Sequence, residues 1–145
     1  MPGTFHIVVA DDDDDDQFII REALQELCAE QVVISSVYDG VQLLDCLNKK
    51  GLFGRETKGP DLIILDINMP LMNGVEALEN IKSNGSFRNI PVVMLSTLRT
   101  IERVDKCALL GALNFYTKPN NITDYKVIFQ QVLDDTLFAE HSISA

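Results

Sequence analysis

The sequence predicts an open, doubly wound α/β sheet, in which helices cover both faces of parallel strands. Over the 145 residues, short apolar segments alternate five times with segments whose apolar residues recur at helical spacing. The short segments are mostly apolar rather than alternating, as expected for parallel strands buried on both faces. Because crossovers between such strands are right-handed, the carboxyl ends of the strands should meet at one edge, where these sheets bind ligands.

The first two strand–helix units precede a predicted loop. β-Branched and apolar residues predict the strands, and apolar residues three or four positions apart predict the helices. The predicted elements are a strand over 5–10, a helix over 15–29, a strand over 31–37 and a helix from Val41 that ends near Gly51. Three glycines and a proline then predict a loop over 51–60.

Three more strand–helix units complete the single domain that the length predicts. The same patterns place strands over 61–66, 90–96 and 113–117, and helices that include 75–81, 101–110 and 123–137. We expect one domain over residues 5–138, between a short N-terminal tail of residues 1–4 and a polar C-terminal tail of residues 139–145.

Acidic residues dominate the charge of the chain. It carries 12 Lys and Arg against 22 Asp and Glu, a net charge of −10, and six of the acids form the run Asp11–Asp16. Because binding to nucleic acid phosphates needs clustered Lys and Arg, no direct nucleic acid partner is expected. The apolar runs fall short of the roughly 20 residues that cross a bilayer. No signal peptide is visible, so we expect a cytoplasmic protein without a membrane partner.

The cysteines do not form a recognisable metal or disulfide framework. Cys28, Cys46 and Cys107 are far apart, no CxxC pair exists, and only two histidines accompany them. A zinc site is therefore not expected, and the three thiols are predicted to be reduced and buried.

Reactive polar side chains follow four of the five predicted strands. They are Asp11 and Asp12, Asp66, Ser96, and Lys118. Three carboxylates at one sheet edge repel one another, and a divalent cation together with the lysine would relieve that repulsion. Oxygen ligands favour Mg²⁺ or Mn²⁺. A carboxylate beside such a cation, with an ammonium and a hydroxyl opposite, is suited to attack phosphorus and form an acyl phosphate.

Four motifs in this order, each at a strand end, resemble the receiver domain of two-component response regulators over about residues 5–137. The motifs are Val9-Ala10-Asp11-Asp12, Leu65-Asp66-Ile67-Asn68-Met69-Pro70 followed by Asn73-Gly74, Val93-Met94-Leu95-Ser96-Thr97, and Tyr116-Thr117-Lys118-Pro119. The resemblance implies a flavodoxin-like sheet with strand order 2-1-3-4-5. It also implies a phosphorelay signalling switch rather than a classical enzyme, a phosphoacceptor that promotes its own phosphorylation and dephosphorylation.

The resemblance further implies a phosphoacceptor and a metal site. Asp66 would accept the phosphoryl group from a sensor histidine kinase or a phosphotransfer protein. Mg²⁺ (or Mn²⁺) would be held by Asp66, by Asp12 directly and by Asp11 through water. The backbone carbonyl of Asn68 would complete the protein ligands of the metal.

Three more positions would carry the signal, again by resemblance. Lys118 would contact the phosphoryl group, Ser96 would be the switch hydroxyl and Phe115 the switch aromatic. Ser96 stands where Thr is commoner and keeps the hydroxyl donor, whereas Phe115 stands where Tyr is frequent and lacks the hydroxyl. The peptide bond between Lys118 and Pro119 is expected to be cis, as is typical of the family.

The resemblance also implies a partner surface. In this family the face of the fourth helix, fifth strand and fifth helix changes on phosphorylation and binds partners or a second copy. Residues 99–108 and 123–131 should border that face here. Because no output domain is visible, we expect the chain to act on a downstream protein, as a phosphate relay or as a homodimer. The loop over 51–60 is a candidate for contact with the kinase.

Other classes of function fit less well. A calcium-binding loop that starts at Asp11 would need Gly at its sixth position, where Asp16 stands. A phosphatase of the haloacid dehalogenase type would need a second Asp two residues after Asp66, where Asn68 stands. An FMN site would need a phosphate-binding loop after the first strand, where six acids repel phosphate. The alternative that stays open is an unphosphorylated pseudo-receiver that acts only as a protein-interaction module.

Overall fold

The computed structural model describes residues 4–48 and 59–138, which form five strands and five α-helices. The strands are β1 (Phe5–Ala10), β2 (Val32–Val37), β3 (Leu62–Asp66), β4 (Val92–Ser96) and β5 (Asn114–Thr117). The helices are α1 (Asp14–Cys28), α2 (Gly40–Leu47), α3 (Gly74–Ser83), α4 (Ile101–Leu110) and α5 (Ile122–Asp135), with a 3₁₀ turn η1 (Ala29–Gln31) after α1. All neighbouring strands are parallel, in the order β2-β1-β3-β4-β5. The predicted flavodoxin-like fold is confirmed.

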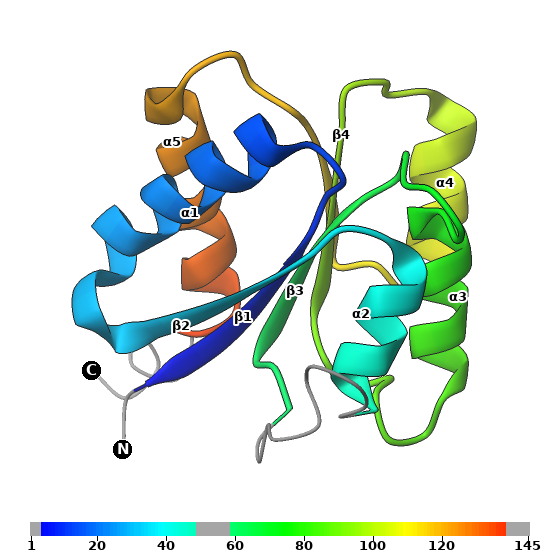
Figure 1. The fold of residues 1–145 in the computed structure, drawn as a ribbon. Coiled ribbons are helices and arrows are strands. Elements are labelled where there is room, and N and C mark those ends of the chain that lie inside the picture. The colour runs from blue at the N-terminus through cyan, green and yellow to red at the C-terminus, as the bar shows by residue number, and fades with distance from the viewer. Residues whose placement is uncertain (1–3, 49–58, 139–145) are drawn as a thin grey trace.

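Helices cover both faces of the sheet, as Figure 1 shows, with α1 and α5 on one face and α2, α3 and α4 on the other. Alternation of side chains along each strand divides the core in two. In β1, Ile7 and Val9 pack on the side of α1 and α5, whereas Val8 and Ala10 pack on the opposite side. The three central strands β1, β3 and β4 are almost entirely buried, which explains why they are apolar on both faces.

Each α-helix begins at a capping side chain, which fixes where the loop after the preceding strand ends. These side chains accept hydrogen bonds from main-chain N–H groups of the first helical turn. The capping residues are Asp13, Asp39, Asn73, Thr100 and Asn121. The loops at the carboxyl ends of the strands are therefore held at both ends, which gives a potential site at this edge a defined shape.

The end of α2 differs from the prediction. The helix ends at Leu47 rather than near Gly51, and the side-chain amide of Asn48 donates to the carbonyl of Leu44 in its last turn, a local alternative to further helical bonds. The loop predicted over 51–60 lies outside the described residues, except for its last two positions. The other predicted bounds agree with the structure within two residues, whereas η1 was not predicted.

The cysteines are buried, as predicted, and Cys28 and Cys107 are free thiols. Burial raises the pKa of both thiols, which keeps them protonated and weakly nucleophilic. Within residues 4–48 and 59–138, no helix has the length and apolar character needed to cross a membrane.

Candidate functional site

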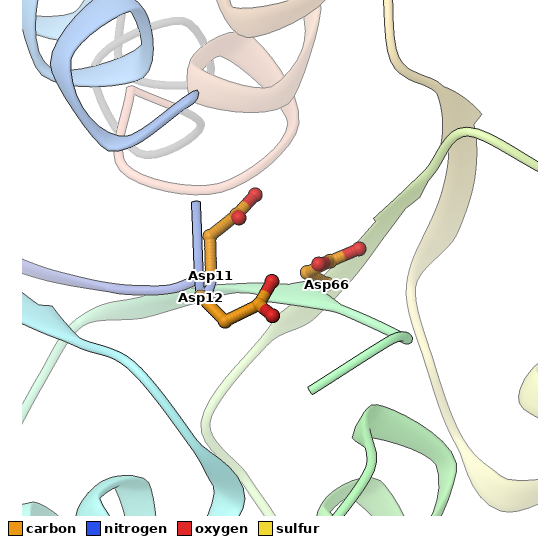
Figure 2. A group of neighbouring side chains, drawn as sticks. All are labelled: Asp11, Asp12 and Asp66. Carbon is orange, nitrogen blue, oxygen red and sulfur yellow. The ribbon is translucent and has the colours of Figure 1, made fainter. Parts of the chain in front are cut away.

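Three carboxylates converge where β1 and β3 end (Figure 2). Ala10 and Leu65 are register partners in the parallel pair, so the next residues, Asp11 and Asp66, lie side by side. Asp12 follows in the loop after β1, and one carboxylate oxygen from each acid lies within 4.8 Å of the others. Asp11 and Asp66 are buried, whereas Asp12 is exposed to solvent. The edge of the sheet therefore holds two desolvated carboxylates and one that water can reach.

Hydrogen bonds in the β1–α1 loop fix the position of these acids. Oδ1 of Asp11 accepts from the N–H of Asp13 at 2.9 Å. Asp13 in turn caps α1 by accepting from the N–H of Asp16 at 3.0 Å. The buried side-chain amide of Gln17 donates to three main-chain carbonyl oxygens at the ends of β1 and β2. The acidic run is thus an ordered turn and helix start, in which Asp12, Asp13, Asp14 and Asp15 remain exposed to solvent.

Lys118 follows β5 and places its ammonium among the carboxylates. Nζ lies 2.8 Å from Oδ2 of Asp11, 2.8 Å from Oδ2 of Asp16 and 3.5 Å from Oδ2 of Asp66. Only 7% of the lysine side chain is exposed. One buried cation therefore faces three carboxylates that come from two strand ends and the first turn of α1.

The predicted cis peptide bond between Lys118 and Pro119 is wrong, since the described residues contain no cis peptide bond. Trans is the more stable isomer of most X–Pro bonds. In this trans form, the N–H of Lys118 donates to the carbonyl of Ser96 at 2.9 Å, and Nζ still reaches the acids. The packing of the site therefore does not require the cis isomer.

The charges of the site are not balanced by the lysine. Burial and then the charge of Asp11 raise the pKa of Asp66 to about 6, although Lys118 acts in the opposite direction. Burial also raises the pKa of Asp11, against the effect of its close contact with Lys118. Burial alone would lower the pKa of Lys118, but the contacts with Asp11 and Asp16 outweigh it and raise that pKa. The lysine stays charged, and negative charge remains that a divalent cation would neutralise.

Ser96 and Phe115 lie on the strands beyond β3. Ser96 ends β4 and is fully buried, and its Oγ accepts from the N–H of Leu98 at 3.3 Å. Phe115 in β5 is buried, and the guanidinium carbon of Arg99 lies 5.8 Å from the centre of its ring. Nη1 of Arg99 also donates to the carbonyl of Phe115 at 3.0 Å, so the β4–α4 loop holds this aromatic residue by two contacts. Asn68, two residues after β3, is exposed.

A family match accounts for this arrangement of residues. Residues 7–130 match the family model of the response regulator receiver domain, which is most of the chain. The chain belongs to this family. The assignment made from the four strand-end motifs is therefore confirmed for the receiver as a whole.

Curated relatives of the receiver include response regulators of the plant Arabidopsis thaliana. The two-component response regulator ARR6 is 32% identical over 125 residues, which are 86% of this chain and 67% of the relative. The two-component response regulator ARR3 is 31% identical over 121 residues, which are 83% of this chain and 52% of the relative. The receiver described here thus spans about half to two thirds of these relatives.

Solved response regulator structures share the fold over nearly the whole receiver. The phosphorylated cyanobacterial phytochrome response regulator RcpA gives a TM-score of 0.84 at 29% identity, over 92% of this chain and 94% of that chain. The Mn²⁺-bound form of response regulator Rcp1 gives a TM-score of 0.79 at 27% identity, over 90% of this chain and 92% of that chain. The layers and strand order described above are therefore those of known response regulators.

The donor set of this receiver fits a hard divalent cation. Asp11, Asp12 and Asp66 offer oxygen ligands only, and the exposure of Asp12 leaves room for water on one side. Such sets favour Mg²⁺ and Mn²⁺, which retain water molecules in their coordination shells. The raised pKa of Asp66 is a second sign, because it reflects negative charge that Lys118 does not offset.

Three residues that contact the site are not predicted by sequence patterns. For Asp16 the sequence predicts only a helix start, yet its carboxylate contacts Lys118. The side-chain amide of Gln17 donates to main-chain carbonyl groups at the ends of β1 and β2, and the guanidinium group of Arg99 lies over the ring of Phe115. The signal for Gln17 is weak: it is a polar residue near the start of a helix that has apolar periodicity. Asp16 and Arg99 carry no local signal, because their contacts depend on how α1 and the β4–α4 loop meet β5.

Proposed function

We propose that the receiver accepts a phosphoryl group on Asp66 from a sensor histidine kinase or a phosphotransfer protein, with Mg²⁺ or Mn²⁺ as cofactor. The observation that carries this proposal is the buried Asp66 carboxylate, which has Asp11 and Asp12 within metal-binding distance and the ammonium of Lys118 at 3.5 Å. A carboxylate so placed has charge stabilisation on both sides for a transferring phosphoryl group. This geometry supports phosphorylation of Asp66, which can be tested directly.

Each residue has a distinct part in the proposed reaction. A carboxylate oxygen of Asp66 attacks phosphorus, and the bond from phosphorus to the donor nitrogen breaks, which leaves an acyl phosphate. Asp11, Asp12 and the backbone carbonyl of Asn68 would hold the metal ion with Asp66, and the ion neutralises charge on phosphoryl oxygens when bound. Lys118 would contact a second phosphoryl oxygen from the other side. Hydrolysis of the acyl phosphate then resets the switch.

Ser96 and Phe115 are proposed to pass the change on to the surface. Movement of the Ser96 hydroxyl toward a phosphoryl oxygen, to which it would donate, would take its Oγ away from the N–H of Leu98, from which it accepts in this structure. That loss disturbs the loop from which Arg99 holds Phe115. Local rearrangement at one residue would thus reach the face of α4, β5 and α5.

This face is the proposed site of a downstream protein or of a second copy of the chain. Exposed apolar side chains occur in both predicted ranges, Ile101 in 99–108 and Val127 in 123–131. Their exposure is compatible with a surface that a partner covers. We place the protein in the cytoplasm, where a kinase domain and reduced buried thiols would both be found.

The test is phosphorylation of the purified chain. Protein, Mg²⁺ and acetyl phosphate are mixed, and the intact mass is followed over time. The expected result is a mass gain of one phosphoryl group that is absent with EDTA and in the Asp66→Asn variant. No gain, or an equal gain in the variant, would contradict the proposal. A chain that takes no phosphoryl group but still binds a partner would instead be the interaction module considered above.

A further inference from the structure

The contact between Asp16 and Lys118 joins two segments that are 102 positions apart in the sequence. Oδ2 of Asp16, in the first turn of α1, lies 2.8 Å from Nζ of Lys118, which follows β5. The two side chains are 30% and 7% exposed, so the pair is largely shielded from water. Asp16 is not among the proposed metal ligands, and the acid cluster that would bind the ion is complete without it.

We infer that Asp16 is a positioning residue, which orients the ammonium of Lys118 for the phosphoryl group on Asp66. An ammonium has three N–H donors in tetrahedral arrangement. Asp16 accepts one of them at 2.8 Å, while Asp11 at 2.8 Å and Asp66 at 3.5 Å face the same ammonium as ion-pair partners. The inference rests on the proposed function, because it assigns to this oriented ammonium the contact with a phosphoryl oxygen.

Orientation matters here because a lysine side chain is flexible. Its four-carbon stem has several rotamers, and fixing one of them costs conformational entropy. A charge-assisted hydrogen bond to Asp16 and the ion pair with Asp11 fix the ammonium before the reaction, so that little reorganisation is needed in the transition state. Asp16 can act as such an anchor because its own segment is rigid: Asp13 accepts from its N–H, and the amide of the adjacent Gln17 is bound to the strand ends.

The neighbouring acids provide a matched control. Asp15 precedes Asp16 in the same helical turn and is exposed, and its carboxylate has no contact with Lys118 among the described residues. Asp15→Asn and Asp16→Asn therefore remove the same charge from nearly the same place. Only the second variant replaces the charged acceptor of Lys118 by a neutral amide oxygen, so a difference between them reports the contact rather than the net charge.

The first measurement is the rate of phosphorylation by acetyl phosphate at saturating Mg²⁺. The loss of one charge-assisted hydrogen bond should slow Asp16→Asn by about ten-fold, while Asp15→Asn stays within about two-fold of the wild type. In a Lys118→Met background, Asp16→Asn should have no further effect, because Asp16 acts through the lysine. An equal slowing with and without Lys118 would overturn the inference, as would an unchanged rate in Asp16→Asn.

The second measurement does not depend on phosphorylation. A buried, hydrogen-bonded ammonium exchanges its protons slowly and gives its own NMR signal, which for Lys118 is identified by its loss in Lys118→Met. That signal should shift or vanish in Asp16→Asn and persist in Asp15→Asn, with circular dichroism showing that all variants fold. A signal unchanged in Asp16→Asn overturns the inference. If the signal depends on Asp16 but the wild type takes no phosphoryl group, the proposed function and the catalytic part of the inference fail, and the anchoring of Lys118 stands.

Discussion

Gly74 packs against the main chain of Asp66 so closely that a methyl group on its α-carbon would come within 2.1 Å of the Asp66 carbonyl oxygen. Gly74 is the first residue of α3, and its N–H donates to the carbonyl of Ile67 at 2.8 Å. Asn73 and Glu76 close a capping box around the same turn. The start of α3 is thus built directly onto the strand end that carries the proposed phosphoacceptor.

Replacing Gly74 by alanine should destabilise the fold markedly. The new methyl group meets main-chain atoms, which cannot rotate away, so we expect a loss of about 2–3 kcal/mol in the free energy of unfolding. Urea unfolding measures the loss. Gly85→Ala is the control, because a methyl group there meets no atom within 4 Å and should change stability by less than about 0.5 kcal/mol. Equal unfolding midpoints for the two variants would contradict the prediction.

Asp66→Asn should make the metal-free protein more stable at neutral pH. The pKa of Asp66 is about 6 in the folded state against 3.8 for an ordinary aspartate, so the folded state binds the proton more tightly. The charged carboxylate therefore costs about 3 kcal/mol at pH above about 7. That cost, and with it the advantage of Asn, should shrink as the pH falls through 6 and vanish below about 3.8.

Urea unfolding in EDTA at a series of pH values measures this difference. Glu79→Gln is the control, since it removes one negative charge at an exposed position of the neighbouring helix α3. Its difference from the wild type should stay small across the same range. An advantage of Asp66→Asn that grows as the pH falls would show that the sign is wrong.

The fold and the three converging acids could be predicted because both follow from local patterns. Apolar strands and helical periodicity can be recognised from residues that are close in the sequence. Parallel topology then brings the strand ends to one edge of the sheet. Asp66 ends its strand and Asp11 and Lys118 each directly follow one, so the topology alone places them together. No side-chain detail is needed for that step.

The remaining contacts could not be predicted because they depend on how the elements are rotated against one another. Asp16 reaches Lys118 only because the first turn of α1 faces the end of β5, which helical periodicity does not define. Arg99 lies in an irregular loop, and its contact with Phe115 depends on the path of that loop. The cis bond expected at Lys118–Pro119 is a feature of the family rather than of a local sequence pattern, and the bond is trans in this structure.

A divalent cation should stabilise the receiver, and Asp12 should contribute to that effect. A ligand that binds only the folded state at one hundred times its Kd adds about 2.7 kcal/mol to the free energy of unfolding. We expect Mg²⁺ and Mn²⁺ to raise the unfolding temperature of the wild type, and Asp12→Asn to weaken their binding by at least about ten-fold, since it removes one ligand of the acid cluster.

Calorimetry with increasing concentrations of either cation measures both quantities. Asp14→Asn is the control, because Asp14 is an exposed acid two positions further on that is not part of the cluster. The affinity of Asp14→Asn for either cation should fall only slightly, because the variant removes one distant charge and no ligand. Equal stabilisation of the wild type and Asp12→Asn by the cations would rule out Asp12 as a direct ligand.

Gln17 should be essential for the stability of the β1 and β2 strand ends. Its Nε2 lies 3.0 Å from the carbonyl oxygens of Val9 and Asp11 and 2.9 Å from that of Val37, all in a buried environment. Leucine has a similar size but no donor, so Gln17→Leu leaves buried carbonyl groups with fewer hydrogen bonds and should cost about 1–3 kcal/mol. Urea unfolding measures the cost, with Gln25→Leu on the exposed side of α1 as the control. Because the same amide holds the main chain at Asp11, Gln17→Leu should also weaken Mg²⁺ binding. An unchanged Kd for Mg²⁺ would show that Gln17 stabilises the strand ends without positioning the acids.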